Sequence, residues 1–150
     1  MKRTYAFIGA LALAAVLAMP ATAQSIRKDL GEVRYDKAVL NLLNGADTNI
    51  DGLRRSAVYQ LGELEAQDAV VPLMGILRTS KDELSRVAAG WALCKIGDER
   101  GLKAVKDAVA SDDSPKVRLH CAWYYNLYVS EGTFTFVPTA TAPNHIAENR

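Results

Sequence analysis

Few of the side chains that carry catalytic or metal-binding chemistry stand close together in this sequence of 150 residues. Its two cysteines and two histidines, Cys94, Cys121, His120 and His145, do not follow the spacing of a zinc site. The sequence contains no glycine-rich phosphate loop, no Gly-x-Ser-x-Gly elbow and no His-Glu-x-x-His helix. We therefore expect no catalytic activity, no metal site and no cofactor.

The acidic residues form pairs where helices are expected to begin. Asp82-Glu83 and Asp112-Asp113 are the two pairs, and capping of free backbone amides at a helix N-terminus explains both. The overall charge is balanced, with 18 basic and 17 acidic side chains and a formal charge of +1. This balance argues against nucleic acid as a partner, because nucleic-acid binding needs a basic surface.

The first 23 residues have the pattern of a secretory signal peptide. Lys2 and Arg3 precede an uncharged run from Ala6 to Met19, and small residues lead up to Ala23. This run is shorter than the roughly 20 residues that a transmembrane helix needs. We expect cleavage after Ala23, a periplasmic or secreted protein, and no membrane insertion after cleavage; the alternative is an uncleaved N-terminal anchor.

Beyond the signal segment, the sequence repeats itself with a period of 32 residues. Three arginines and three large aromatic residues fall at this spacing: Arg54, Arg86 and Arg118, and Tyr59, Trp91 and Trp123. Between them, apolar residues recur at helical spacing, as at Val70, Leu73 and Leu77. A period in the thirties built from two amphipathic helices is typical of an α-solenoid.

The periodicity predicts an all-α chain with five helices, at 51–64, 68–79, 82–96, 99–111 and 114–129, after a half repeat at 36–44. Ser80 and Glu83 form a predicted capping box, and Ser114 precedes a proline at the first helical position. Asp68 and Asp98 are expected at the start of the second helix of their repeats.

The closest copy of the repeat reads Arg86-Val87-Ala88-Ala89-Gly90-Trp91-Ala92-Leu93, followed by Lys95-Ile96-Gly97-Asp98. With 53–62 and 117–125, it resembles the repeat unit of HEAT proteins, in particular the short HEAT-like repeats of phycocyanobilin lyase subunits. The resemblance implies a solenoid of about two and a half helical hairpins over 36–129. A linker or short helix at 24–35 precedes it, and an extended or disordered tail at 130–150 follows.

The repeated arginines lie in the first turn of their helices, where a positive charge opposes the helix dipole and needs a compensating partner. We expect Asp68 and Asp98 to accept hydrogen bonds from Arg54, Arg86 and Arg118. The alternative is an arginine ladder that holds an anionic ligand. The two cysteines are expected to be too far apart for a disulfide, and therefore to be free, buried thiols.

Two surfaces are candidates for partner binding. The second helices are expected to line a concave groove with Val71, Met74, Arg78, Lys103 and Lys106, a mixed apolar and basic surface suited to a peptide or an acidic loop. The last helix carries Trp123, Tyr124, Tyr125 and Tyr128 with no repeat after it, and this end is either a cap or a contact surface. Phe134 and Phe136 in the tail are expected to cover it.

These features predict an exported scaffold or adaptor for a protein or peptide partner. The resemblance implies one alternative, an accessory subunit of a lyase or other modifying enzyme, although export argues against a role with bilins. The aromatic end implies another, a component of envelope assembly that self-associates.

Overall fold

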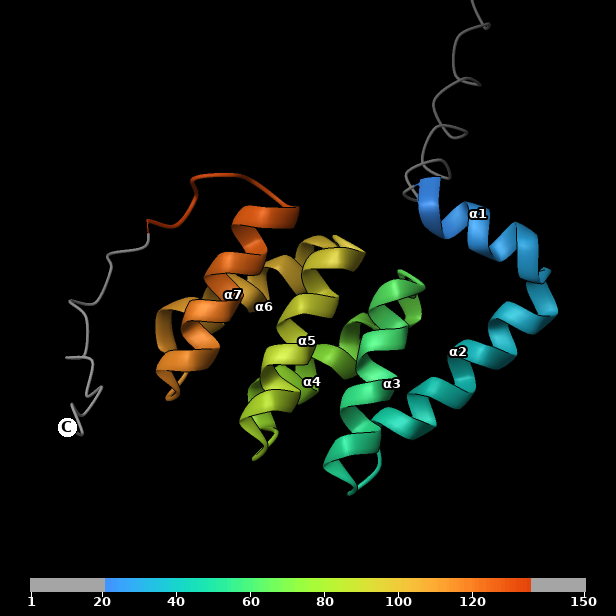
Figure 1. Ribbon diagram of the computed structural model, residues 1–150, viewed down its shortest axis with the longest axis horizontal. Helices are drawn as coiled ribbons and strands as arrows, with labels where there is room; N and C mark the ends of the chain where they lie inside the picture. Colours follow the sequence, from blue (N-terminus) through green and yellow to red (C-terminus); the bar gives the residue numbers. More distant parts are fainter. Residues whose placement is uncertain (1–20, 136–150) are drawn as a thin grey trace, which may run out of the picture.

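The computed structural model describes residues 21–135, with side chains from Ile26 onward. Within this range it contains seven α-helices and one short 3₁₀ turn (Figure 1). The elements are α1 (Ala21–Leu30), α2 (Glu32–Ala46), α3 (Asp51–Glu63), the 3₁₀ turn (Gln67–Ala69), α4 (Val70–Thr79), α5 (Glu83–Ile96), α6 (Glu99–Ser111) and α7 (Pro115–Tyr128). Residues 1–20 of the predicted signal peptide and 136–150 of the predicted tail, with Phe136, lie outside the described residues.

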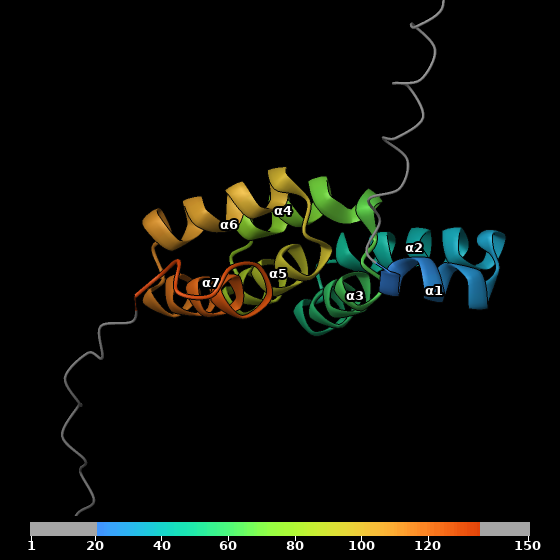
Figure 2. The ribbon, with the colours of Figure 1, turned by 90° about the horizontal axis from the view of Figure 1, so that it is seen from above.

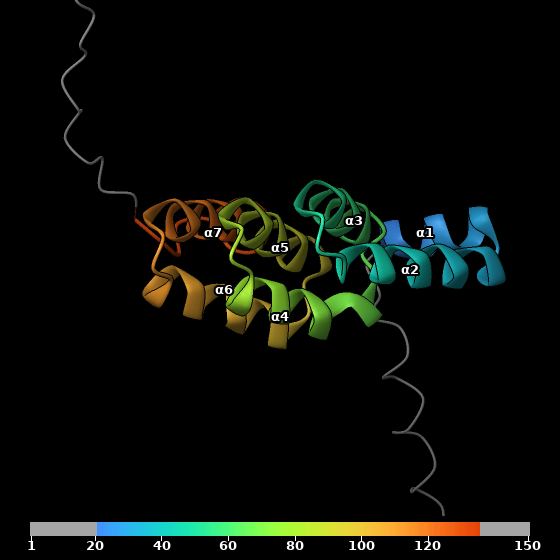
Figure 3. The same ribbon diagram turned by 90° about the horizontal axis from the view of Figure 1, so that it is seen from below.

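The helices from α3 onward form two layers, as a solenoid requires. Figures 2 and 3 show α3, α5 and α7 side by side in one layer and α4 and α6 in the other, with α1 and α2 at the N-terminal end of the stack. We call α3, α5 and α7 the first helices and α2, α4 and α6 the second helices. Each second helix packs closely on the first helix that follows it. The all-α solenoid expected from the 32-residue period is confirmed.

The core is centred on α5, which is enclosed by α3 and α7 on its sides and by α4 and α6 beneath. Ten of its 14 residues are buried, so this helix is apolar or small nearly all round. Leu61, Leu73, Leu93 and Val105 lie fully inside the same core. In the part of the chain that the structure describes, no helix is long and apolar enough to cross a membrane.

Two glycines permit the first helices to approach one another closely. A Cβ at Gly62 would lie 2.5 Å from Trp91 and 2.9 Å from the Cα of Ala92, and one at Gly90 would lie 2.6 Å from the Sγ of Cys121. Contacts this short are not tolerated in a packed core. Glycine is therefore required for the spacing between repeats, and Cys121 fills the space beside Gly90. Cys94 and Cys121 are both free and buried, as expected.

The turns between helices confirm some sequence predictions and correct others. Ser114 caps α7 by accepting from the amide of Val117, and Asp98 caps α6. The predicted capping box of Ser80 and Glu83 is wrong. Asp82, immediately before the first helical residue of α5, accepts from the amide of Ser85 instead.

Asp68 does not cap a helix. It lies inside the 3₁₀ turn that precedes α4, and neither this turn nor α4 has a side-chain N-cap. In the turn before it, Glu65 adopts a left-handed conformation with φ of 48°, at the position where the next repeat has Gly97 with φ of 74°. A glycine adopts this conformation freely, whereas a residue with a Cβ is strained in it.

Candidate partner-binding site

The three repeated arginines join each first helix to the end of the second helix before it. Arg54, Arg86 and Arg118 each donate to the backbone carbonyl six residues earlier, which belongs to Thr48, Ser80 and Asp112 respectively. Carbonyls at a helix C-terminus lack intrahelical partners and carry partial negative charge. The positive charge near the N-terminus of each first helix is therefore compensated by the C-terminal end of its neighbour.

This pattern corrects the expectation that Asp68 and Asp98 accept from these arginines. Asp98 binds Arg100, which lies two residues away, through two side-chain hydrogen bonds. Arg100 also holds the pKa of Asp98 below its usual value. The acceptor that all three arginines share is a backbone carbonyl, which any residue type supplies, so the sequence carries no signal for it.

Arg86 has a second set of partners that ties the middle repeat to the last. Its guanidinium donates to both carboxylate oxygens of Asp112, at 3.1 and 3.0 Å, and to Asp113 at 2.8 Å. Both Arg86 and Asp112 are almost fully buried, with side chains 10% and 8% exposed. Burial by itself raises the pKa of Asp112, but hydrogen bonds from Arg86 and from the amide of Ser114 outweigh it and lower that pKa.

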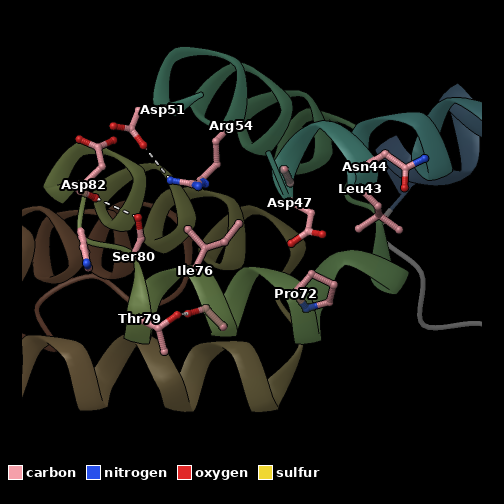
Figure 4. Close-up of a pocket in the computed structure, with 13 residues that line it drawn as sticks. Leu43, Asn44, Asp47, Asp51, Arg54, Pro72, Ile76, Thr79, Ser80 and Asp82 are labelled. Atoms are coloured by element: carbon pink, nitrogen blue, oxygen red, sulfur yellow. Dashed lines mark hydrogen bonds and ion pairs between the residues drawn. The ribbon is translucent and has the colours of Figure 1, made fainter. Parts of the chain in front are cut away.

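A pocket of about 790 Å³ opens between α2 and α4, beside the start of α3. We call it the first inter-repeat pocket. It is lined by Leu43, Asn44, Ala46, Asp47, Asp51, Arg54, Pro72, Gly75, Ile76, Thr79, Ser80, Lys81 and Asp82. Figure 4 shows Arg54 entering from α3, with Pro72 and Ile76 on α4 opposite it. The pocket therefore combines an apolar wall with one partly buried guanidinium.

A second inter-repeat pocket, of about 680 Å³, opens between α4 and α6. It is lined by Leu77, Arg78, Thr79, Ser80, Lys81, Arg86, Ala104, Asp107, Ala108, Ser111, Asp112 and Asp113. Most of these positions are those of the first pocket shifted by 32 residues: Arg86 takes the place of Arg54, and Ala104 and Ala108 replace Pro72 and Ile76. The repeat thus creates the same pocket twice on one face of the stack.

The predicted groove residues fall on different flanks of the second helices. Arg78 lines the second pocket, but Val71 and Met74 line neither pocket; Val71 is 62% exposed, and Met74 is packed against the core. Lys103 forms an ion pair with Asp107 along α6. Lys106 lies 5.1 Å from the ring centre of Tyr125 on α7. The pockets use the neighbouring positions on α4, including Pro72 and Ile76, which sequence reasoning did not identify.

The repeated aromatic residues Tyr59, Trp91 and Trp123 pack against one another only between the first two repeats. The rings of Tyr59 and Trp91 pack with centres 5.1 Å apart. Trp123 instead packs on Tyr124 of its own helix at 5.3 Å, while Trp91 donates to the hydroxyl of Tyr128 at 3.4 Å. The last repeat therefore does not continue the ring packing seen between Tyr59 and Trp91.

The terminal face of α7 is partly open and partly covered. Leu119, Trp123 and Leu127, spaced four residues apart, are 55%, 51% and 57% exposed. Beside them, Asn126 exchanges two hydrogen bonds with the backbone of Phe134, whose ring packs edge-on against Tyr125 at 5.4 Å. Phe134 thus covers part of this end, as expected, and a turn at residues 131–132 precedes it.

The two-layered stack of helices with its repeated inter-helix pocket defines a helical repeat protein of the α-solenoid class. The family model for HEAT repeats matches residues 37–126, and the chain belongs to the HEAT-repeat family. Repeats of this family generally mediate protein–protein interaction and are typically non-catalytic. Comparison with curated proteins finds no match.

Proposed function

We propose that this protein is an exported, non-catalytic scaffold that binds a protein partner across the face formed by α2, α4 and α6. The observation that carries the proposal is the pair of equivalent inter-repeat pockets on that face. Helical repeat proteins use their extended surfaces for binding, and a series of similar pockets suits an extended segment of a partner.

The predicted signal peptide supports export to the periplasm or the outside of the cell. Lys2, Arg3 and the apolar run from Ala6 have the required order. Mass spectrometry of the protein purified from its own cell envelope tests this. We expect a chain that begins at Gln24; recovery of the full chain from the membrane would favour an uncleaved anchor.

The binding face is tested by affinity capture with matched variants. A charge introduced on the apolar wall of the first inter-repeat pocket, Ile76→Glu, is expected to remove the partner that the unaltered protein captures. The matched variant Leu119→Glu places the same charge on the terminal face of α7. The double variant Lys103→Glu/Lys106→Glu reports on the groove residues predicted from sequence. If Leu119→Glu removes the partner and Ile76→Glu does not, the proposal that the partner binds across α2, α4 and α6 is contradicted.

Self-association is the second candidate function, favoured by the exposed apolar stripe of Leu119, Trp123 and Leu127. An apolar terminal face is unusual, because terminal repeats generally present a polar outer surface. Light scattering during size-exclusion chromatography tests it: a dimer that becomes a monomer in Leu119→Glu would establish self-association, and a monomer at all concentrations would exclude it. The resemblance to lyase subunits suggests an accessory enzyme role, which an enzyme among the captured partners would support.

A further inference from the structure

The two inter-repeat pockets differ in how much of their arginine the chain itself occupies. Arg86 donates four hydrogen bonds, to both oxygens of Asp112, to Asp113 and to the carbonyl of Ser80. Arg54 donates two, to Asp51 and to the carbonyl of Thr48. Among the described residues, Nε of Arg54 donates no hydrogen bond. The first pocket therefore retains donor capacity that the second pocket uses internally.

The cause lies at two positions in the loop after α4. The residues equivalent to Asp112 and Asp113 in the first pocket are Ser80 and Lys81. The backbone at Ser80 (φ −64°, ψ 130°) closely matches that at Asp112 (φ −62°, ψ 140°). The first pocket thus preserves the geometry that presents a carboxylate to the arginine, but the chain supplies no carboxylate there, and Lys81 adds a positive charge.

We propose that the first inter-repeat pocket binds a carboxylate of the partner protein at Arg54, in the position that Asp112 occupies beside Arg86. This inference rests on the proposed function and specifies which chemical group of the partner protein is bound. A guanidinium binds a carboxylate through paired, charge-assisted hydrogen bonds. Pro72 and Ile76 on the opposite wall accept an apolar neighbour of that carboxylate. The partner segment is therefore acidic and apolar.

The other carboxylates that line the pocket do not fill this position. Asp51 already pairs with Arg54 at 2.8 Å, and Asp82 pairs with Arg55 at 2.7 Å and accepts from Ser85. Arg86 likewise holds two carboxylates at once. The side chain of Arg54 is 17% exposed, so solvent competes only weakly for its remaining donors.

The chain provides its own probe for this site. A labelled peptide of residues 108–116, which contains Asp112 and Asp113, carries the segment that contacts Arg86 within the fold. Fluorescence anisotropy is expected to show binding to the unaltered protein. Arg54→Met, or replacement of both aspartates of the peptide by asparagine, should weaken it about tenfold or more. Arg100→Met, which removes an exposed guanidinium outside the pocket, is the control and should leave binding unchanged.

A second variant fills the site with carboxylates of the chain itself. Ser80→Asp/Lys81→Asp gives the first pocket the acidic residues of the second. We expect the new carboxylates to pair with Arg54, to raise the melting temperature by several degrees, and to abolish peptide binding. The same peptide with an amidated C-terminus distinguishes a side-chain carboxylate from a chain-terminal one. If the amidated form binds, the bound carboxylate belongs to a side chain. If only the free form binds, the bound carboxylate is the chain terminus.

Two results would overturn the inference. The first is peptide binding that is unchanged in Arg54→Met; the second is a Ser80→Asp/Lys81→Asp variant that still binds the peptide and melts no higher than the unaltered protein. Either result would leave the proposed function standing if Ile76→Glu still removes the captured partner. Capture that is insensitive to Ile76→Glu would instead overturn the proposed function.

Discussion

Replacing Arg86 with methionine removes the guanidinium that joins α5 to the loop between α6 and α7. Methionine retains most of the apolar stem of the side chain, so the change mainly affects charge and hydrogen bonding. The variant leaves Asp112, whose side chain is 8% exposed, without the two hydrogen bonds that Arg86 donates to it. It also frees the carbonyl of Ser80 at the end of α4.

The expected cost is about 3 kcal/mol in the free energy of unfolding. Breaking a buried ion pair by removing one partner costs roughly 3–5 kcal/mol, and the lower end applies because Asp113 beside it is 90% exposed and adds little. A loss of about 3 kcal/mol corresponds to a fall of about 15 °C in melting temperature for a domain of this size. The remaining helices keep their apolar core, so we expect the variant to fold.

Urea unfolding followed by circular dichroism at pH 7 and at pH 3 measures the effect. The folded-state pKa of Asp112 is lowered from 3.8, so the stabilisation is fully present above the unfolded-state pKa and is lost as the pH falls through the folded-state value. Without the hydrogen bonds and charge of Arg86, the folded-state pKa of Asp112 rises, so the variant loses less stability than the unaltered protein as the pH falls. The difference between the two proteins should therefore shrink at low pH.

The control for Arg86→Met is a variant that removes an exposed arginine from an ion pair. Arg100→Met removes the exposed member of the pair with Asp98, and we expect a much smaller change in unfolding. A loss below about 1 kcal/mol for Arg86→Met, equal at both pH values, would be typical of a surface pair. That result would refute the reasoning that this arginine couples the repeats through a buried carboxylate.

Three further predictions concern packing, backbone strain and thiols. Gly90→Ala places a methyl 2.6 Å from the Sγ of Cys121 and should cost about 1–3 kcal/mol, whereas Gly52→Ala, with nothing within 4 Å, should stabilise by about 0.5 kcal/mol; equal effects in urea unfolding would refute the close approach. Glu65→Gly should stabilise by about 1 kcal/mol by relieving its left-handed conformation, and a loss of stability would contradict this. Burial raises the pKa of both Cys94 and Cys121 to about 12, so a thiol reagent at pH 8 should react with neither in the folded protein and with both after unfolding without reductant; rapid reaction before unfolding would contradict their burial.

The 32-residue period predicted the fold because each repeat places the same residue types at the same helix positions. The predicted helix at 99–111 matches α6, and that at 51–64 differs from α3 by one residue at its end. The partners of the repeated arginines could not be predicted in this way. Arg54, Arg86 and Arg118 bind backbone carbonyls that have no residue-type signature, although their common offset of six residues places all three at the end of the preceding helix.

The pocket residues were missed because each second helix has two flanks. On α4, Pro72 and Ile76 line the pocket shared with α2, whereas Arg78 lines the pocket shared with α6. Helical periodicity identifies the buried stripe of Val70, Leu73 and Leu77, but it does not specify which flank faces which neighbour. That assignment depends on how successive repeats are rotated, and the rotation is set by packing between helices.

We propose that the face formed by α2, α4 and α6 binds a partner protein. Site-specific photocrosslinking in the native cell envelope tests it most directly, with the crosslinker placed in turn at Ile76, at Ala108, at Gln60 on α3 and at Trp123 on α7. We predict one crosslinked partner from Ile76 and Ala108, lost when Arg54→Met is added, and none from Gln60. The same partner crosslinked only from Gln60 or Trp123 would contradict the account.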